Sequence, residues 1–353
     1  MIPALAWFAV AAALQEGPPL ISPEVAVDGI VTFRIRAPKA SKVAVSSWDL
    51  GPWLGGPAKE LARDERGVWS VSIGPVDPGL YDYVFEIDGV RTVDMANGLV
   101  CAGRHRPRSA VEVPGPPDRP RRDEWRDVPH GAVTTHWYAS GGARRRVHVY
   151  TPPGYAKDPE RRYAALYLLH GSGDDDSHWT VLGRANVVAD NLVADKRAEP
   201  MIIVMPDVEG NYEGCERDLL EVWIPLVESA YRVKPDRESR AIAGLSNGGG
   251  QSLWAGLRHL DRFGWVGAFS ASTWEMASGV PGAQKDPDRL NAALRLLWIR
   301  VGSEDHLLGT TRGFIGMLKA KGIRHDYAET AGGHAWSVWR RDLAEFLPLL
   351  FRP

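Results

Sequence analysis

The alternation of apolar runs with helix-length segments after residue 130 most strongly constrains the fold of this chain. Near-continuous hydrophobic runs occupy residues 165–169, 201–205, 240–243, 266–269 and 296–301. Strands of this composition are buried on both faces of a sheet. Segments with helical length and helical apolar spacing lie between them, at 218–231, 248–259 and 307–321. Strands that alternate with helices form a mostly parallel sheet with helices on both faces, so we expect an α/β domain over residues 131–353.

The first third of the chain has a different periodicity. Apolar and polar side chains alternate along residues 31–36, 42–46, 68–73 and 81–87, with proline, glycine and aspartate between these segments. Period-two alternation is typical of strands with one buried face, and several short strands separated by turns form a β-sandwich. We therefore expect a small all-β sandwich over residues 21–113.

Prolines and arginines dominate the stretch between these two parts, at residues 114–122. Proline fixes φ and removes a backbone donor, so a proline-rich stretch suits a semi-rigid linker. We place this linker at residues 114–130. Two domains also agree with the length of 353 residues, because a domain typically holds about 150 residues.

The longest apolar run is at the start of the chain, at residues 1–14. A membrane span needs about 20 apolar residues, so we expect no stable span here. The alanines at 11–13 resemble a signal-peptide cleavage site, although no Lys or Arg precedes Arg34 to supply the usual positive start. We expect residues 1–20 to be a signal peptide and the protein to be secreted or periplasmic. A cytosolic protein with an apolar first segment is the alternative.

The charge balance and the cysteines exclude several classes of protein. Lys and Arg number 42 and Asp and Glu number 44, which provides no basic field for nucleic acid. Cys101 and Cys215 are too few for a zinc finger or a disulfide scaffold, and whether they pair stays open. The sequence lacks a Lys-Ser/Thr phosphate loop and a His-Glu-x-x-His motif, so we expect no cofactor and no metal ion. We interpret the acidic run Asp174, Asp175 and Asp176 as a solvated loop rather than a metal site.

Residues 244–248 read Gly-Leu-Ser-Asn-Gly, directly after a strand-like run and directly before a helical segment. In a nucleophile elbow, a sharp strand-to-helix turn exposes the serine hydroxyl, and flanking glycines let neighbouring backbone pass without a Cβ clash. A plain glycine turn that opens a helix would have the same letters. The context favours Ser246 as a nucleophile.

A serine nucleophile requires a base, and the base requires an orienting carboxylate. In α/β domains that carry a nucleophile elbow, the catalytic residues follow one another along the chain in the order serine, acid, histidine. Asp305 follows the run at 296–301, and His334 follows a Gly-Gly turn after the last strand-like segment, so both lie where a crevice forms at the carboxyl ends of strands. We prefer Asp305 to its neighbour Glu304. The histidines that fit this order or place less well are His178, His259, His306 and His325.

Acyl transfer also needs donors for the developing oxyanion. One should be the backbone N–H of Asn247, which follows the nucleophile, and the other should come from the loop after an earlier strand. Residues 170–173, His-Gly-Ser-Gly, form such a loop. We choose the N–H of Ser172, with Gly171 next, and expect His170 to bond within the loop.

Several aromatic residues are candidates for substrate contact. Those on loops near the expected crevice are Trp179, Tyr212, Trp274 and Trp336. They form either an aromatic substrate pocket or part of the core, since aromatic side chains mostly supply buried area. For Trp48 and Trp53 of the first domain, packing is favoured over stacking on sugar rings.

Together these residues resemble the carbohydrate esterase family of α/β hydrolases that includes feruloyl esterases, acetyl-xylan esterases, esterase D and enterochelin-esterase-like proteins. The similarity covers about residues 134–351 and is most specific at 170–173, 244–251 and 332–340. It implies that Ser246, Asp305 and His334 are nucleophile, acid and base. Asn247 departs from the family, which most often has Met there. The N–H still donates, but the pocket wall becomes more polar.

The first domain is similar to the early-set immunoglobulin-like modules found ahead of such esterases and of starch-branching enzymes. Residues 31–38, 67–69, 78–83 and 88–89 carry this likeness. The resemblance implies an α/β hydrolase preceded by an immunoglobulin-like sandwich.

Three functions follow from these patterns. The first is a serine esterase that removes feruloyl or acetyl groups from plant polysaccharide through an acyl-enzyme. The second is a siderophore-lactone esterase with the same chemistry, and the third is a non-catalytic glycan-binding protein on this fold. The acyl group, its carrier and the oligomeric state are left open.

Overall fold

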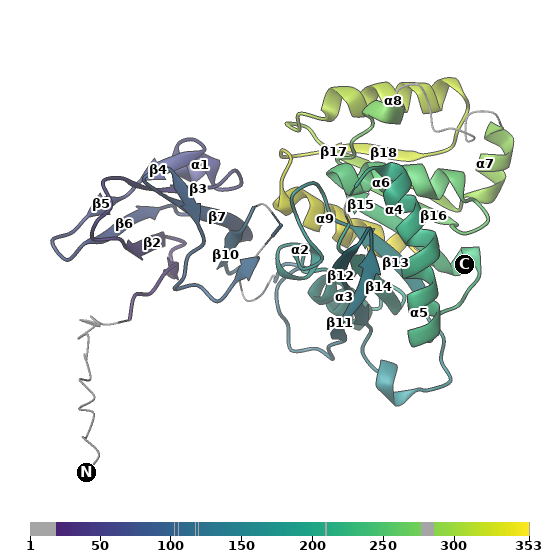
Figure 1. The fold of residues 1–353 in the computed structure, drawn as a ribbon, viewed down its shortest axis with the longest axis horizontal. Helices are drawn as coiled ribbons and strands as arrows, with labels where there is room; N and C mark the ends of the chain where they lie inside the picture. Colours follow the sequence, from purple (N-terminus) through teal and green to yellow (C-terminus); the bar gives the residue numbers. More distant parts are fainter. Residues whose placement is uncertain are drawn as a thin grey trace, which may run out of the picture.

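The computed structural model describes residues 19–101, 103–104, 106–116, 118, 120–208, 210–276 and 286–352. Residues 1–18, and with them most of the predicted signal peptide, lie outside the described residues. The chain forms an all-β part and an α/β part that lie side by side (Figure 1). Among the described residues, we find no helix with the length and apolar character needed to cross a membrane.

The N-terminal part contains two antiparallel sheets. The first has the order β1 (Glu24–Val25), β2 (Val31–Arg36), β6 (Val68–Ile73) and β5 (Ala62–Arg63). The second has the order β4 (Ala58–Glu60), β3 (Val43–Ser46), β7 (Gly79–Ile87), β10 (Arg108–Val113) and β9 (Val100–Cys101), and β8 (Val90–Thr92) pairs with β7. A short helix, α1 (Gly51–Leu54), follows β3. Inward-facing residues such as Val31, Phe33, Val43 and Phe85 form a common core, as the period-two pattern predicts.

The C-terminal part is built on one sheet of eight strands. Its order is β11 (Ala132–Ser140), β12 (Ala143–Thr151), β14 (Met201–Pro206), β13 (Ala164–Leu169), β15 (Arg240–Leu245), β16 (Trp265–Phe269), β17 (Leu296–Gly302) and β18 (Asp326–Thr330). The pairs β11–β12 and β12–β14 are antiparallel, and the remaining pairs, from β14–β13 to β17–β18, are parallel. Each predicted apolar run has become one of the parallel strands.

Helices cover both faces of this sheet (Figure 1). Side chains of α4 (Tyr212–Asp218), α5 (Ile224–Ala230), α6 (Ser246–Arg258) and α8 (Leu308–Ala320) pack in one hydrophobic cluster. Side chains of α2 (His178–Val181), α3 (Ala185–Ala194) and α9 (Trp336–Phe346) pack in a second cluster. Helix α7 (Pro287–Ala293) precedes β17, and a π-helical turn (Leu219–Trp223) joins α4 to α5. The expected α/β-hydrolase architecture is therefore confirmed.

The N-terminal sheets pack directly against the α/β part. Leu80, Cys101 and Ala110 belong to the same buried cluster as α3 and α9. The connecting segment is also held in place, since the side-chain amide of Asn191 donates to the carbonyl oxygens of Arg122 (2.8 Å) and Glu124 (2.7 Å). The two parts are thus joined by an interface as well as by the chain.

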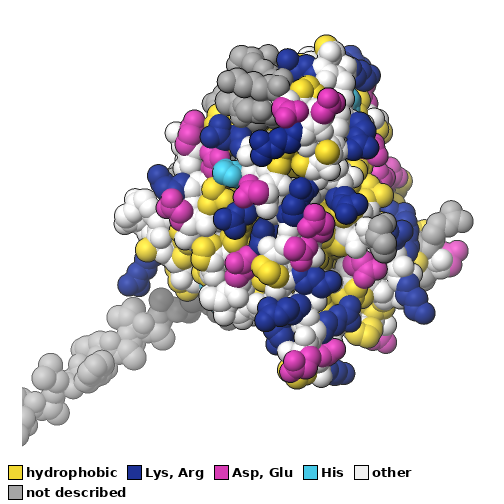
Figure 2. All heavy atoms as spheres, turned by 90° about the vertical axis from the view of Figure 1, so that its right-hand side faces the viewer, with side chains coloured by type: hydrophobic (Ala, Val, Ile, Leu, Met, Phe, Trp, Pro, Cys, Tyr) yellow, Lys and Arg dark blue, Asp and Glu magenta, His cyan; other side chains and the backbone are white. Residues whose placement is uncertain are grey.

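Two further features bear on the sequence predictions. Cys101 and Cys215 are both buried and free and belong to different clusters, so they do not pair. On the face drawn in Figure 2, basic and acidic side chains are interspersed, which agrees with the small net charge of the sequence.

Candidate active site

Ser246 lies at a tight turn between a strand and a helix. β15 ends at Leu245 and α6 begins at Ser246, whose φ is +52°. Few non-glycine residues adopt this left-handed conformation, and it is costly where it occurs. A Cβ on Gly248 would lie 2.2 Å from the carbonyl oxygen of His170, and one on Gly244 would lie 2.5 Å from that of Gly248. Glycine at both positions therefore permits the close packing that holds the turn.

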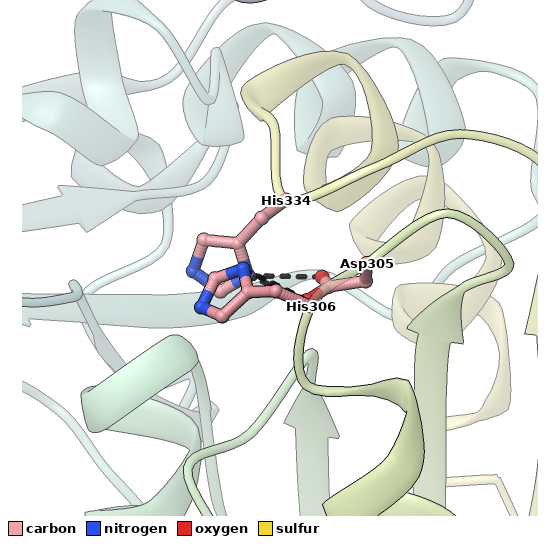
Figure 3. A group of neighbouring side chains, drawn as sticks. All are labelled: Asp305, His306 and His334. Atoms are coloured by element: carbon pink, nitrogen blue, oxygen red, sulfur yellow. Dashed lines mark hydrogen bonds and ion pairs between the residues drawn. The ribbon is translucent and has the colours of Figure 1, made fainter.

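His334 joins Ser246 to Asp305. Its Nε2 is 3.0 Å from Ser246 Oγ, and its Nδ1 is 2.9 Å from Asp305 Oδ2 and 3.1 Å from Oδ1. Figure 3 shows the imidazole directed at the carboxylate. Because an ionised carboxylate only accepts hydrogen bonds, Nδ1–H donates to Asp305, which leaves Nε2 free to accept from the serine hydroxyl.

Asp305 is held as a carboxylate. Its side chain is buried, and burial alone would raise its pKa, but hydrogen bonds from His334 and from the N–H of Leu307 (2.8 Å) hold the pKa below the ordinary value. Hydrogen bonds to the charged form lower the pKa of a carboxyl group. Asp305 is thus an ionised hydrogen-bond acceptor that can orient the imidazole of His334.

The alternative residues occupy other environments. Glu304 is exposed. His306 is exposed as well, and its Nδ1 is 3.5 Å from Asp305 Oδ1. Its ring packs edge-to-face against that of His334, with 4.5 Å between the ring centroids (Figure 3). Asp305, His306 and His334 lie close enough to share a cation, but both ring nitrogens of His334 already have partners in Asp305 and Ser246. The arrangement therefore fits proton transfer better than metal binding.

The loop after β13 passes directly beside Ser246. A Cβ on Gly171 would lie 3.1 Å from Ser246 Cβ. Gly171, Ser172 and Asn247 line one cavity of about 180 Å³. The predicted oxyanion donors are thus together beside Ser246.

His170 holds this loop in shape. Its Nδ1 is 2.8 Å from the carbonyl oxygen of Gly171, and its Nε2 accepts the N–H of Val208 at 2.9 Å. The ring is buried and both nitrogens have backbone partners. The contact with Gly171 is the bonding within the loop that we expect of His170, and the bond from Val208 joins the loop to the segment after β14.

The cavity has walls that sequence reasoning missed. Arg104, from the segment between β9 and β10, lines it and forms an ion pair with Asp207. Gln251 lines it as well. Gln251 follows Asn247 by four residues on α6, and such residues share one helix face, so this spacing was an available signal. No sequence pattern predicts that Arg104 lines this cavity, because Arg104 is far from Ser246 along the chain.

The four aromatic candidates differ in their exposure. Trp179 and Trp336 are 1% and 2% exposed and pack edge-to-face at 5.1 Å. Tyr212 is 4% exposed, and its hydroxyl donates to the carbonyl oxygen of Ser272. The substrate-contact interpretation of these three residues is wrong, because their rings lie in the core. Trp274 is 58% exposed.

The acidic run is buried rather than solvated. Asp174, Asp175 and Asp176 are 6%, 6% and 1% exposed. His178 lies 3.3 Å from Asp174 and 3.0 Å from Asp175, and Asp176 pairs with Arg146 at 2.9 Å. The expectation of a solvated loop is wrong because its counter-charges come in part from a neighbouring strand, β12.

The fold and the site together define an α/β hydrolase, since the elbow, the strand order and the succession of serine, acid and histidine all agree with that class. Comparison with known proteins is consistent with this. The model of the Esterase family matches residues 139–350. The chain belongs to this family of carboxylic ester hydrolases.

A protein of Xylanibacter ruminicola, named endo-1,4-beta-xylanase/feruloyl esterase, is 33% identical over 349 residues. The match covers 94% of this chain and 46% of that protein, so the chain spans less than half of that relative. A solved structure named ferulic acid esterase is 30% identical, with a TM-score of 0.55, over 62% of this chain and 97% of that one.

A structure of the enterobactin esterase FES from Shigella flexneri is 18% identical, with a TM-score of 0.64. The match covers 90% of this chain and 92% of that one, and at this identity it concerns the fold alone. It extends over the N-terminal β part as well as the α/β part.

Proposed function

We propose that this protein is a serine esterase that removes feruloyl or acetyl groups from plant polysaccharide through an acyl-enzyme. The observation that carries the proposal is His334, which lies 3.0 Å from Ser246 Oγ through Nε2 and 2.9 Å from Asp305 through Nδ1. A serine nucleophile, its base and the group that orients the base are thus in contact.

In the first half-reaction, Ser246 Oγ attacks the ester carbonyl carbon while its proton passes to His334 Nε2. Asp305 stabilises the imidazolium that forms. The negative charge on the carbonyl oxygen is received by the N–H of Asn247 and by that of Ser172 or Gly171, since preorganised donors at this point stabilise the transition state. The intermediate collapses with cleavage of the ester C–O bond, and His334 gives the proton to the leaving alcohol oxygen.

In the second half-reaction, a water molecule replaces the alcohol. His334 takes a proton from this water, whose oxygen attacks the acyl carbon. The bond to Ser246 Oγ then breaks, the serine recovers its proton from His334, and the free carboxylic acid leaves.

The substrate class rests on the named relatives. A relative called a xylanase/feruloyl esterase and a structure called a ferulic acid esterase favour an ester of a hydroxycinnamic acid on a plant polysaccharide. A siderophore lactone is the second candidate, favoured by the extent of the match to the enterobactin esterase. We also propose that the chain is exported, on the basis of the apolar residues 1–14.

The test is a substrate panel of methyl ferulate, acetylated xylan and enterobactin, assayed with the wild-type protein and Ser246→Ala. We expect hydrolysis of methyl ferulate and a loss of about 10³-fold or more in kcat for the variant. Ser229→Ala is the matched control, because this serine is exposed on α5 and its hydroxyl donates to the carbonyl oxygen of Leu226 in its own helix.

Each result has a consequence. Full turnover by Ser246→Ala would show that the nucleophile is assigned wrongly. Hydrolysis of enterobactin without methyl ferulate would favour the siderophore esterase, and binding of xylan without hydrolysis of any ester would favour a glycan-binding protein.

A further inference from the structure

Trp48 of the N-terminal part lies beside the turn that carries His334. A Cβ built on Gly333, the residue before His334, would be 3.6 Å from Nε1 of Trp48. Trp48 belongs to the loop between β3 and α1, far from the α/β part in sequence. The N-terminal part therefore reaches the rim of the proposed active site.

The Trp48 side chain is presented to solvent by a loop that is fixed on both sides. Ser47 Oγ donates to the carbonyl oxygen of Asp82 at 2.6 Å, and Asp49 Oδ1 accepts a hydrogen bond from Ser337 Oγ of α9 at 3.0 Å. Between these anchors, Trp48 is 73% exposed. A ring that is already positioned loses little conformational freedom when a ligand binds.

The interface behind this loop keeps Trp48 in place relative to His334. Arg340, buried on α9, donates to Asp123 at 2.6 Å and to the carbonyl oxygen of Leu80 at 2.8 Å. Arg104 of the same N-terminal part lines the cavity that Gly171, Ser172 and Asn247 also line. The N-terminal part thus contributes to the surroundings of the nucleophile at two places.

Trp48 lies on the side of the site where we expect the alcohol half of the ester. Because His334 protonates the leaving oxygen, the alcohol half lies on the imidazole side. An exposed indole offers a flat apolar face, and ligand sites commonly use such faces together with a few polar groups. Trp53, the other tryptophan of this region, is partly buried, packs edge-to-face against Tyr81 at 5.5 Å and contacts the sandwich core.

We infer that Trp48 is a specificity-determining residue that stacks on the sugar ring of the alcohol half of the ester, so that the N-terminal part forms one wall of the substrate site. This inference rests on the proposed function, and it adds a contact for the carrier rather than for the acyl group. It makes the enzyme selective for sugar esters over simple alkyl esters.

The experiment compares two esters of one acid, a feruloylated arabinoxylan oligosaccharide and methyl ferulate. For Trp48→Ala we expect the ratio of kcat/KM for the sugar ester to kcat/KM for the methyl ester to fall about tenfold, the size expected for one lost aromatic contact. Trp48→Phe, which keeps an aromatic face, should restore most of the ratio. Trp125→Ala, which removes another tryptophan of similar exposure at 65%, should leave the ratio unchanged.

A binding measurement separates this inference from the proposed function. In the Ser246→Ala background, calorimetry with the same oligosaccharide should show about tenfold weaker binding when Trp48 is also replaced by Ala. An unchanged ratio, an unchanged Kd, or no binding by Ser246→Ala would overturn the role of Trp48. If the wild type cleaves neither ester but the binding difference is found, the proposed function fails and the sugar contact stands.

Discussion

The guanidinium of Arg340 donates a hydrogen bond to the carbonyl oxygen of Leu80 at 2.8 Å. Arg340 lies on α9, which directly follows the turn of His334, and Leu80 lies on β7 of the N-terminal part. The same side chain also bonds Asp123 and the carbonyl oxygen of Leu182. One buried cation therefore links the proposed catalytic histidine's helix to the N-terminal part and to the connecting segment.

Replacing Arg340 by Leu should destabilise the protein by about 3 kcal/mol, because loss of one partner leaves a largely buried carboxylate and two carbonyl oxygens without their donor. Chemical unfolding of Arg340→Leu and wild type measures this difference. Arg341→Leu is the control, since Arg341 is exposed on the same helix, and it should change the free energy of unfolding by less than about 0.5 kcal/mol. Equal effects of the two substitutions would contradict a special role for Arg340.

Asp305→Asn should lower kcat about 10³ to 10⁴-fold with little change in fold. The amide of Asn donates to Nδ1 and so favours the imidazole tautomer with its proton on Nε2, which cannot accept the proton of Ser246. Steady-state kinetics with p-nitrophenyl acetate measures the loss. Glu304→Gln, a matched change at the neighbouring exposed residue, should retain activity, and a larger loss there than at Asp305 would reverse the assignment of the acid.

Gly171→Ala should reduce kcat by about tenfold or more, because displaced oxyanion donors lose transition-state stabilisation. The added Cβ would lie 2.7 Å from Leu245 Cδ1 and 3.1 Å from Ser246 Cβ, so the loop or these two neighbours must shift and the donors lose their alignment with Ser246. Kinetics and a thermal melt, measured together, separate lost donors from lost folding. Gly309→Ala on α8, where an added Cβ meets no atom within 4 Å, is the control, and a drop in kcat as large as that of Gly171→Ala would count against the proposed role of the loop.

Asp342→Asn should stabilise the protein at pH 8 but not at pH 4. Burial on α9 raises the pKa of Asp342 from the ordinary 3.8 to about 7, so folding takes up a proton between these values and the free energy of unfolding falls as the pH rises through this window. Asn stays neutral, and the gain at pH 8 is about 4 kcal/mol, since one pKa unit corresponds to about 1.4 kcal/mol. Urea unfolding of both proteins at pH 4 and pH 8 tests this, and a difference that does not depend on pH would argue against it.

Much of the α/β architecture could be predicted because its signals are local. The run at 201–205 became β14 (Met201–Pro206), and the run at 266–269 became β16 (Trp265–Phe269). The elbow at Ser246 depends on glycine, which permits a sharp turn between adjacent elements. The order of Ser246, Asp305 and His334 could be proposed because parallel strands bring their carboxyl ends to one edge.

The sequence by itself thus determined the class of fold, through the period of its apolar residues and the chemistry of its turns. Only the tertiary structure decided which residues surround the site. It buried Trp179 and Trp336 in the core, supplied Arg146 as a counter-charge for Asp176, and brought Trp48 beside the turn of His334. Burial, ion pairing and cavity walls depend on contacts between segments distant in the chain, and residue spacing does not encode such contacts locally.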